Sequence, residues 1–332
     1  MTASSRAPES AAAPAPAPAA PSVATPLPPP APAPTVGVPL LGISAPDLAA
    51  FDRFAAATGT QPDVYDVFEA WGNDRPLDLE LAEAVAVRGA RLSITWEPWD
   101  ASGSHTRQPA YSLRSIAAGD HDGYIDRFAR SVQEHGRPVS LRLMHEMNGK
   151  WYPWGSGVNG NRPGDFVPAY RHVHDRFTAL GVTNVEWVWA PNAVYTGSAP
   201  LAPLYPGDAY VDAVGVSNYN WGNEIRDGYR TSWASFGELF DPSLAELRSL
   251  TTRPVWISET GSSDSGGSKA EWVAALSAEL AARPEIVGLI WFDHVDEART
   301  VDWRIEDDAD AVAAWRTVFD ARPRVPRGQP LD

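Results

Sequence analysis

The chain has 332 residues, no cysteine and a formal net charge of −15 from 27 basic and 42 acidic side chains. The absence of cysteine excludes disulfide frameworks, thiolate metal sites and cysteine nucleophiles. The excess of negative charge disfavours binding to nucleic acid or to an anionic membrane surface. No run of 18 apolar residues occurs, so the sequence predicts no transmembrane helix.

Residues 1–36 consist almost entirely of Ala, Pro, Ser and Thr and hold 11 of the 31 prolines. Such a composition predicts a disordered, extended leader, largely polyproline II, that cannot build a core. It fits a spacer to another module as well as a tail without a role, and no signal peptide is visible in it. The remaining body, residues 37–325, is long enough for one large catalytic domain.

Short apolar, β-rich runs alternate with longer amphipathic runs after residue 36. Strands that alternate with helices favour a parallel sheet, and eight such repeats favour closure into a barrel rather than an open sheet. The predicted fold is therefore an α/β fold, a (β/α)8 TIM barrel. The eight predicted strands are Val36–Ile43, Val64–Phe68, Arg91–Trp96, Val139–His145, Val185–Ala190, Ala213–Asn218, Val255–Ser258 and Val287–Phe292.

Helical patterns lie between most of these strands. The predicted helices Tyr124–Glu134 and Phe166–Leu180 are each followed by a glycine that can end a helix. Ser268 and Glu271 have the spacing of a capping box that opens the predicted helix Trp272–Ala281. Neither GxGxxG after the first strand nor GxxxxGK[ST] occurs, which disfavours a nucleotide-binding fold.

Two glutamates, Glu146 and Glu259, directly follow the fourth and seventh predicted strands. Catalytic groups of a (β/α)8 barrel lie at the C-terminal ends of its strands. Hydrolysis of a glycosidic bond needs one carboxylic acid to protonate the leaving oxygen and a second carboxylate to attack or to activate water. A separation of about 5–5.5 Å gives retention of configuration and a wider one gives inversion. The alternative is a structural role for both, paired with Arg142 or another barrel arginine.

Tryptophans gather at the predicted strand ends, where flat rings can stack on the apolar faces of sugars. The tryptophans in such positions are Trp96, Trp99, Trp151, Trp154, Trp221 and Trp291. Packing between elements is predicted instead for Trp187, Trp189, Trp233, Trp272 and Trp315. An acidic cleft lined with tryptophan suits a neutral polysaccharide rather than a polyuronate.

Other charged residues support weaker interpretations. Glu97 and Asp100 fit either binding of sugar hydroxyls or a salt bridge within a loop. His172 and His174 are two apart on a predicted helix, so they do not share a face and are poor metal partners. The acidic run at residues 306–310 is interpreted as the N-terminus of a following helix, since it lacks the spaced pattern of a calcium loop. No metal and no cofactor are therefore expected.

The segment RLMHEMNGKWYPWG at residues 142–155 resembles the acid/base motif of glycoside hydrolase family 26. Further segments in order along roughly residues 60–320 are similar to the same family, among them NVEWVWAPN, YPGDAYVDAVGVSNYNWG, PVWISETGSS and WFDHVDEARTVDWRIEDD. The resemblance implies a (β/α)8 barrel from a family of retaining β-glycanases. These are mostly endo-β-1,4-mannanases, with mixed-linkage β-1,3-1,4-glucanases and β-1,3-xylanases among them.

The resemblance also implies roles for individual residues. Glu146 corresponds to the general acid/base and Glu259 to the nucleophile. Glu146 must then start protonated, with a pKa raised by burial or by the neighbouring anion. The implied substrate-binding residues are His145 at the cleavage site, Trp151 and Trp291 against the sugar, Tyr219 as the donor to the nucleophile, Arg142 near a catalytic carboxylate, and Asn192. Leu143 stands where many members have proline, a departure that should not disturb the chemistry.

The sequence thus predicts a retaining endo-β-glycanase acting on a neutral β-linked polysaccharide, with β-1,4-mannan ranked narrowly before mixed-linkage β-1,3-1,4-glucan. A barrel that only binds polysaccharide is the alternative from another class, and the intact glutamate pair disfavours it. A barrel isomerase or aldolase would need a phosphate-binding glycine loop or a Schiff-base lysine. Gly266 and Gly267 are the nearest match, but they precede an ordinary capping box. A monomer is expected, and the substrate class implies that it acts outside the cell or at its surface.

Overall fold

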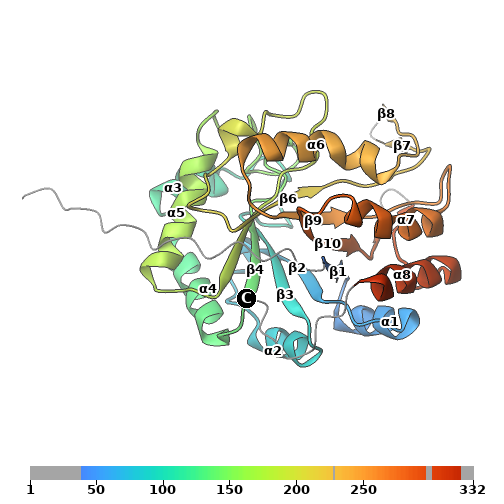
Figure 1. Ribbon diagram of the computed structural model, residues 1–332. Coiled ribbons are helices and arrows are strands. Elements are labelled where there is room, and N and C mark those ends of the chain that lie inside the picture. The colour runs from blue at the N-terminus through green and yellow to red at the C-terminus, as the bar shows by residue number, and fades with distance from the viewer. Residues whose placement is uncertain (1–38, 227–228, 297–300, 323–332) are drawn as a thin grey trace, which may run out of the picture. The chain divides into compact units, whose positions relative to one another are not determined.

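The computed structural model describes residues 39–226, 229–296 and 301–322, and the predicted leader at residues 1–36 lies outside them. Eight parallel strands close into a barrel in the order β1-β10-β9-β6-β5-β4-β3-β2 (Figure 1). The barrel strands are β1 (Leu40–Ser44), β2 (Val64–Ala70), β3 (Arg91–Glu97), β4 (Val139–Leu143), β5 (Val185–Trp189), β6 (Ala213–Ser217), β9 (Val255–Thr260) and β10 (Ile286–Phe292). The predicted (β/α)8 barrel is confirmed.

Helices surround this barrel, as Figure 1 shows. They are α1 (Leu48–Thr58), α2 (Leu79–Val87), α3 (Leu113–Ala118), α4 (Asp122–His135), α5 (Phe166–Ala179), α6 (Phe236–Leu250), α7 (Lys269–Ala281) and α8 (Ala309–Ala321). Two short hairpins lie outside the barrel, β7 (Ile225–Arg226) with β8 (Tyr229–Arg230) and β11 (Val295–Asp296) with β12 (Val301–Asp302). Among the described residues, no helix has both the length and the apolar character that a membrane crossing requires.

Helix ends follow the sequence signals closely. The Ser268 side chain accepts from the Glu271 backbone N–H (3.2 Å) at the start of α7, which is half of the predicted capping box. A complete box occurs at Ser235 and Glu238 and opens α6. Asp308 caps α8 by accepting from two backbone N–H groups, so the acidic run before this helix is its N-terminus, as predicted.

The barrel has two cores, one on each face of its strands. Residues that point inward at one level form a small apolar cluster of Val64, Val188, Ala190, Ala213, Trp256 and Ile290. Trp256 fills much of this space, because a Cβ at Gly288 would lie 2.1 Å from its ring. The larger core lies between the strands and the helices and contains the outward-pointing Trp187 and Trp189, as predicted. Period-two alternation along each strand therefore decides which side chains can reach the barrel mouth.

Candidate active site

Glu146 is presented by a backbone that leaves the strand geometry. The strand β4 ends at Leu143 rather than at the predicted His145, because Met144 and Glu146 have φ of 49° and 54°. Positive φ is unfavourable for side chains of this size, so tertiary contacts have to hold the turn. The Met144 N–H donates to Trp96 O (3.1 Å) and the Glu146 N–H donates to Ala190 O (2.7 Å). These two hydrogen bonds continue the pairing of β4 with β3 and β5 beyond Leu143, and they fix the direction of the Glu146 side chain.

Glu259 reaches the barrel mouth through a β-bulge in β9. Ile257 pairs with Val216 and Glu259 pairs with Ser217, so one residue of β6 faces two of β9. A register shift at the same place appears against β10. A bulge redirects the side chain that follows it. Ser258 and Glu259 consequently both point toward the barrel interior, and Glu259 enters the mouth from a strand that β6 and β5 separate from β4.

Among the described residues, the Glu146 carboxyl group receives hydrogen bonds only from neutral groups. Trp151 Nε1 donates to Oε2 (2.7 Å) and Asn192 Nδ2 donates to Oε1 (3.0 Å). Asn192 is itself fixed by a reciprocal pair of hydrogen bonds with Asn148, at 2.8 and 2.9 Å. Burial, and second the negative charge of Glu259, raise the pKa of Glu146 to about 7. Glu146 is thus suited to carry a proton near neutral pH.

The Glu259 carboxylate lies instead against a cation. Arg142 Nη2 lies 2.5 Å from Glu259 Oε1 in an ion pair. The Tyr219 hydroxyl donates to Glu259 Oε2, and the Asn218 N–H donates to Glu259 O (3.1 Å). Arg142 is 98% buried, so the pair is shielded from solvent. Arg142 and Tyr219 thus lie beside the Glu259 carboxylate, at the places that the resemblance implies.

The two glutamates belong to one hydrogen-bonded network. Asn192 Nδ2, which donates to Glu146, also donates to Ser217 O (3.3 Å). The Ser217 hydroxyl accepts from Arg142 Nη1 (3.3 Å), and Arg142 pairs with Glu259. A path of contacts therefore runs from one carboxyl group to the other across β5, β6 and β4. The structure brings Glu146, Glu259, Arg142, Tyr219, Asn192 and Trp151 together.

Two further buried carboxyl groups lie in this part of the barrel. Asp66 on β2 is fully buried, and burial raises its pKa to about 6 against the opposing effect of Arg142. Glu97 at the end of β3 accepts from Trp99 Nε1 (3.3 Å), and burial raises its pKa to about 8. The sequence analysis missed Asp66, although a lone aspartate inside an apolar strand was a usable signal. This buried position, bonded to an indole, is not that of a loop salt bridge, and the predicted binding of sugar hydroxyls by Glu97 remains a prediction.

His145 lies directly before Glu146 and is buried. Its ring contacts Phe68, Tyr152 and Trp154, with centroids 5.9, 4.7 and 5.8 Å apart. Its Nδ1 has no hydrogen-bond partner among the described residues. Burial and the nearby Arg142 hold the pKa of His145 well below its usual value. The histidine is therefore neutral, and its predicted contact with the sugar remains a prediction.

Several aromatic side chains near these groups are accessible. Trp151 and Tyr195 form a nearly parallel pair, with ring centroids 6.1 Å apart and an interplanar angle of 29°. They are 37% and 42% exposed, respectively. A second group, in which each ring lies within 6.3 Å of another member, comprises Phe68, Tyr219, Trp221 and Phe292 together with the buried Trp303. Trp151 and Trp221 are thus the tryptophans at strand ends whose rings a sugar could stack on.

The structure does not bring Trp291 to the cleft. Trp291 is fully buried, its Nε1 donates to Trp303 O (2.8 Å), and its ring packs against Trp272 and Trp315 on the helix side. Its neighbour Phe292 points inward and contacts Tyr219. Alternation along β10 is the physical reason, since adjacent residues of a strand point to opposite faces.

Trp96 fails as a sugar platform for the same reason. Its neighbours Thr95 and Glu97 point inward on β3, whereas Trp96 stacks on Phe128 of α4 (centroids 4.4 Å apart). Trp154 is also fully buried, and Trp99 is 7% exposed. These rings support the walls of the site from behind rather than lining it.

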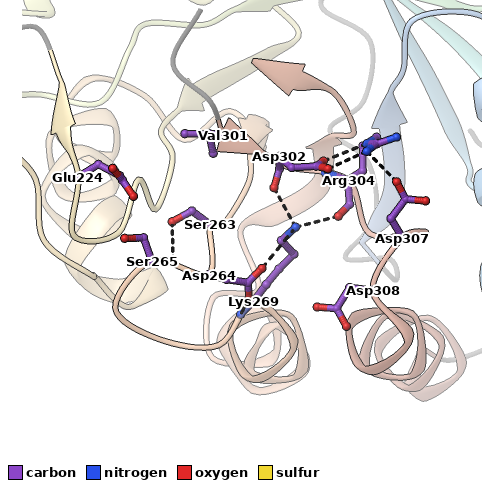
Figure 2. A pocket seen from close by; sticks show the side chains of 10 residues that line it. All are labelled: Glu224, Ser263, Asp264, Ser265, Lys269, Val301, Asp302, Arg304, Asp307 and Asp308. Atoms are coloured by element: carbon purple, nitrogen blue, oxygen red, sulfur yellow. Dashed lines mark hydrogen bonds and ion pairs between the residues drawn. The ribbon is translucent and has the colours of Figure 1, made fainter. Parts of the chain in front are cut away.

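A hollow of about 350 Å³ lies beside the aromatic group and contains neither Glu146 nor Glu259. Figure 2 shows that five of its charged residues are linked by hydrogen bonds and ion pairs, namely Asp264, Lys269, Asp302, Arg304 and Asp307. Lys269 Nζ donates to Asp302 O and Arg304 O (both 2.9 Å), and Arg304 pairs with Asp302 and Asp307 (both 2.7 Å). Trp303, between Asp302 and Arg304, contacts Tyr219 with centroids 5.1 Å apart. The paired residues that line the hollow therefore help to hold Trp303 in place.

The remaining polar candidates lie away from the two glutamates. Asp100 accepts from Ser102 within its own loop, and His172 pairs with Asp122 at 2.7 Å. His174 faces Asp175 rather than His172. Within the described ranges 39–226, 229–296 and 301–322, no group of three or more His, Cys, Asp or Glu side chains has the arrangement of a metal site.

Comparison with known proteins places these residues in a family context. The family model described as glycosyl hydrolase family 26 matches residues 101–273, which is about half of the chain. Endoglucanase H of Acetivibrio thermocellus is 34% identical over 281 residues, covering 83% of this chain and 29% of that protein. A mannan endo-1,4-β-mannosidase of Bacillus subtilis is 25% identical over 203 residues, covering 52% and 54%. A β-1,3-xylanase of a Vibrio species is 35% identical over 117 residues, covering 33% and 24%.

The chain thus spans between about a quarter and half of the length of these relatives. Solved structures agree on the fold. A modular endo-β-1,4-mannanase from Cellulomonas fimi superposes with a TM-score of 0.62 at 20% identity and covers 86% of this chain and 71% of its own. The family 26 domain of a Prevotella bryantii endo-β-mannanase/endo-β-glucanase superposes with a TM-score of 0.61 at 14% identity, covering 84% and 88%. At these identities the structural likeness supports the (β/α)8 fold alone.

Proposed function

Because the chain belongs to glycosyl hydrolase family 26, it is a glycoside hydrolase, and we propose that it cleaves its polysaccharide internally with retention of configuration. Glu146 is the acid/base and Glu259 the nucleophile in this proposal. The observation that carries it is the contrast between the two glutamates. Glu146 is held by neutral donors with a pKa raised to about 7, and Glu259 is held by Arg142.

The first step uses both side chains in their resting forms. The Glu259 carboxylate attacks the anomeric carbon while protonated Glu146 donates its proton to the departing glycosidic oxygen. The bond between the anomeric carbon and that oxygen breaks, and a covalent glycosyl ester forms on Glu259. Arg142 and the Tyr219 hydroxyl hold the Glu259 carboxylate in place for this attack.

The second step follows from the electrostatics of the first. Esterification removes the negative charge of Glu259, which is one of the causes that raise the pKa of Glu146. The pKa of Glu146 therefore falls, and its carboxylate becomes a base for an incoming water molecule. Water attacks the anomeric carbon, the ester bond to Glu259 breaks, and Glu146 regains its proton. Two displacements on the same carbon restore the original configuration.

For the substrate, we propose a neutral β-glucan before the mannan that the sequence analysis ranked first. The relative named endoglucanase H matches 83% of this chain at 34% identity, whereas the Bacillus subtilis mannanase matches 52% at 25%. β-Mannan is the second candidate, because several of the other relatives are mannan endo-1,4-β-mannosidases. The net charge of −15 disfavours an anionic polymer in either case.

The test compares polymers under one set of conditions. The protein is incubated with barley β-glucan, galactomannan and β-1,3-xylan, and the products are sized over time. We expect rapid shortening of barley β-glucan into a ladder of oligosaccharides, which indicates internal cleavage. Cleavage of galactomannan alone would reverse the substrate order. No reducing-sugar release from any of the three, with Glu146 and Glu259 intact, would contradict hydrolysis of these polymers.

A further inference from the structure

Arg142 lies between two carboxylates rather than beside one. Its Nη2 is 2.5 Å from Glu259 Oε1 and 3.7 Å from Asp66 Oδ2. The three side chains come from β4, β9 and β2, and none is more than 7% exposed. A buried guanidinium with two anionic neighbours needs contacts that fix its orientation, because either carboxylate can attract it.

The Thr95 hydroxyl supplies such a contact. It accepts from Arg142 Nε (2.9 Å) and Nη2 (2.6 Å), and it lies 3.3 and 3.2 Å from the two oxygens of Asp66, to which it donates. A threonine hydroxyl has one proton, so donation to Asp66 turns its lone pairs toward Arg142. Ser93 donates to Asp66 Oδ1 (2.7 Å) and fixes the aspartate in turn.

The register of the sheet builds this arrangement. Asp66 pairs with Ser93 between β2 and β3, and Thr95 pairs with Arg142 between β3 and β4. The guanidinium also lies over the Phe68 ring, 5.6 Å from its centroid, and donates to the Ser217 hydroxyl (3.3 Å). Of its contacts, those with Thr95 and Asp66 come from the side of the barrel away from Glu259 and fix it there.

We propose that Asp66 is a positioning residue, which acts through Thr95 and Arg142 to hold the Glu259 carboxylate in the geometry of attack. The inference rests on the proposed role of Glu259 as nucleophile. Asp66 does not touch the sugar in this proposal. It sets the direction of the Thr95 hydroxyl, and it limits how strongly Arg142 is drawn toward Glu259 by offering the guanidinium a second anion.

The charge of Asp66 is itself sensitive to pH. The charged and titratable groups that act on it are Arg142 from β4, Glu259 from β9, Glu97 from β3 and Tyr65 from its own strand. Burial raises the pKa of Asp66 to about 6, so the aspartate loses its charge as the pH falls through that value. The positioning effect therefore weakens on the acid side of the pH–rate profile.

Asp66→Asn tests the inference, because the amide keeps the shape and removes the charge. We expect kcat to fall by about 10- to 100-fold, since small displacements of a reacting group have effects of this size, with KM within about twofold. The acid limb of the kcat profile should move to lower pH, because the variant has lost the aspartate that titrates there. Circular dichroism and a thermal melt check the fold. Wild-type kcat with an unchanged acid limb would overturn the inference.

Thr95 gives an independent test if Asp66→Asn does not fold. Thr95→Val removes the hydroxyl at nearly constant volume and should lower kcat as Asp66→Asn does, whereas Thr95→Ser should restore it to within about twofold. The double variant Asp66→Asn, Thr95→Val should lose no more than the worse single variant, since both act through Arg142. Additive losses, or failure of the serine to rescue, would contradict the proposed link.

Glu186 provides the matched control. It is also a strand carboxylate with a hydroxyl and an arginine partner, Ser140 at 2.6 Å and Arg91 at 3.0 Å, but at the other end of the barrel. Glu186→Gln should leave kcat and its pH profile unchanged, so an equal effect in this variant would reveal a merely structural role. Glu259→Ala distinguishes a failure of the proposed function from a failure of this inference alone. If it stays active, the proposed function fails, whereas an inactive Glu259→Ala with a normal Asp66→Asn overturns only this inference.

Discussion

The ends of β4 and β9 present the same side chain to the same cleft in two different ways. At β4, a turn with positive φ carries Glu146, and its donors are an amide and an indole. At β9, a bulge carries Glu259, and its partners are a guanidinium and a phenol. Neither backbone is regular, so each end departs from ideal strand geometry to aim its carboxyl group.

The difference shows how environment alone can give two glutamates opposite tasks. Neutral donors around a buried carboxyl group do not offset the cost of burying its charge, so the proton stays on Glu146 near neutral pH. At Glu259, a buried guanidinium lies against the carboxylate instead. The four predictions that follow test this contrast, beginning with the largest expected effect.

Removal of the Glu259 carboxylate should have the largest effect. Glu259→Ala should lower kcat on the preferred polymer by about 10⁴-fold or more, because no group is left to form the glycosyl ester. Added azide should restore some turnover and give a glycosyl azide of inverted configuration, since it enters the space of the missing nucleophile. Nuclear magnetic resonance of the product checks the configuration. An azide product of retained configuration would exchange the roles of the two glutamates.

Glu146→Ala should lower turnover of the polymer less, by about 10²- to 10⁴-fold, which is the usual range for general acid–base catalysis. A substrate with a good leaving group needs no proton for its departure, so its glycosylation should be largely spared. Stopped-flow kinetics with an aryl glycoside of the preferred sugar should then show a burst. Equal losses on the polymer and the aryl glycoside would argue against the acid role of Glu146.

The neutral hydrogen-bond donors to Glu146 should determine the pH at which kcat/KM falls on the alkaline side of the pH–rate profile. Wild-type kcat/KM should fall above about pH 7 as Glu146 loses its proton. Trp151 and Asn192 both lower the pKa of Glu146, so Trp151→Phe or Asn192→Ala should move this limb upward by about one pH unit. Tyr219→Phe removes the donor to Glu259 instead and should leave the limb in place. A shift of the alkaline limb in Tyr219→Phe, with no shift in Trp151→Phe or Asn192→Ala, would contradict the different roles given to the partners of the two glutamates.

Glu97 gives the smallest test, because it is buried without a cation of its own. Its folded-state pKa of about 8 lies above the ordinary value, so its contribution to stability is present at low pH and is lost as pH rises toward 8. Glu97→Gln removes this loss, and its Tm at pH 9 should exceed that of the wild type by about 2–4 °C more than at pH 5. Parallel melting curves for the two proteins would show that Glu97 is not protonated in the fold.

Much of the fold and of the candidate site could be predicted from the sequence. The spacing of apolar residues indicates the strands, and the positions directly after the strands indicate the candidate catalytic residues. Apolar runs of strand length located all eight barrel strands, and the residues directly after them located Glu146 and Glu259. Arg142, predicted to face inward, lies in contact with Glu259, and the catalytic role of this carboxylate stays a prediction. Such features depend on alternation along one strand, which a single sequence displays.

Other features depend on contacts between strands, which a single sequence does not display. The bulge before Glu259 appears only when β9 is paired with β6 and β10. Trp291 was predicted at the cleft because it ends a strand, yet its neighbour Phe292 is the residue that points inward. Asp66 is polar inside an apolar strand, but its partner Arg142 is 76 positions away in the sequence and two strands away in the sheet.

The first and last described residues of the barrel meet at the end away from the catalytic mouth. Arg322 Nη1 donates to Pro39 O (3.1 Å) and also pairs with Asp63. Pro39 directly precedes β1, so this contact lies at the N-terminal ends of the strands, whereas Glu146 and Glu259 lie beyond the C-terminal ends. A tether attached at either position would leave the barrel end that carries Glu146 and Glu259 facing away from the point of attachment. A short peptide joining the two positions would also allow new termini to be opened elsewhere without stretching the closing seam of the barrel.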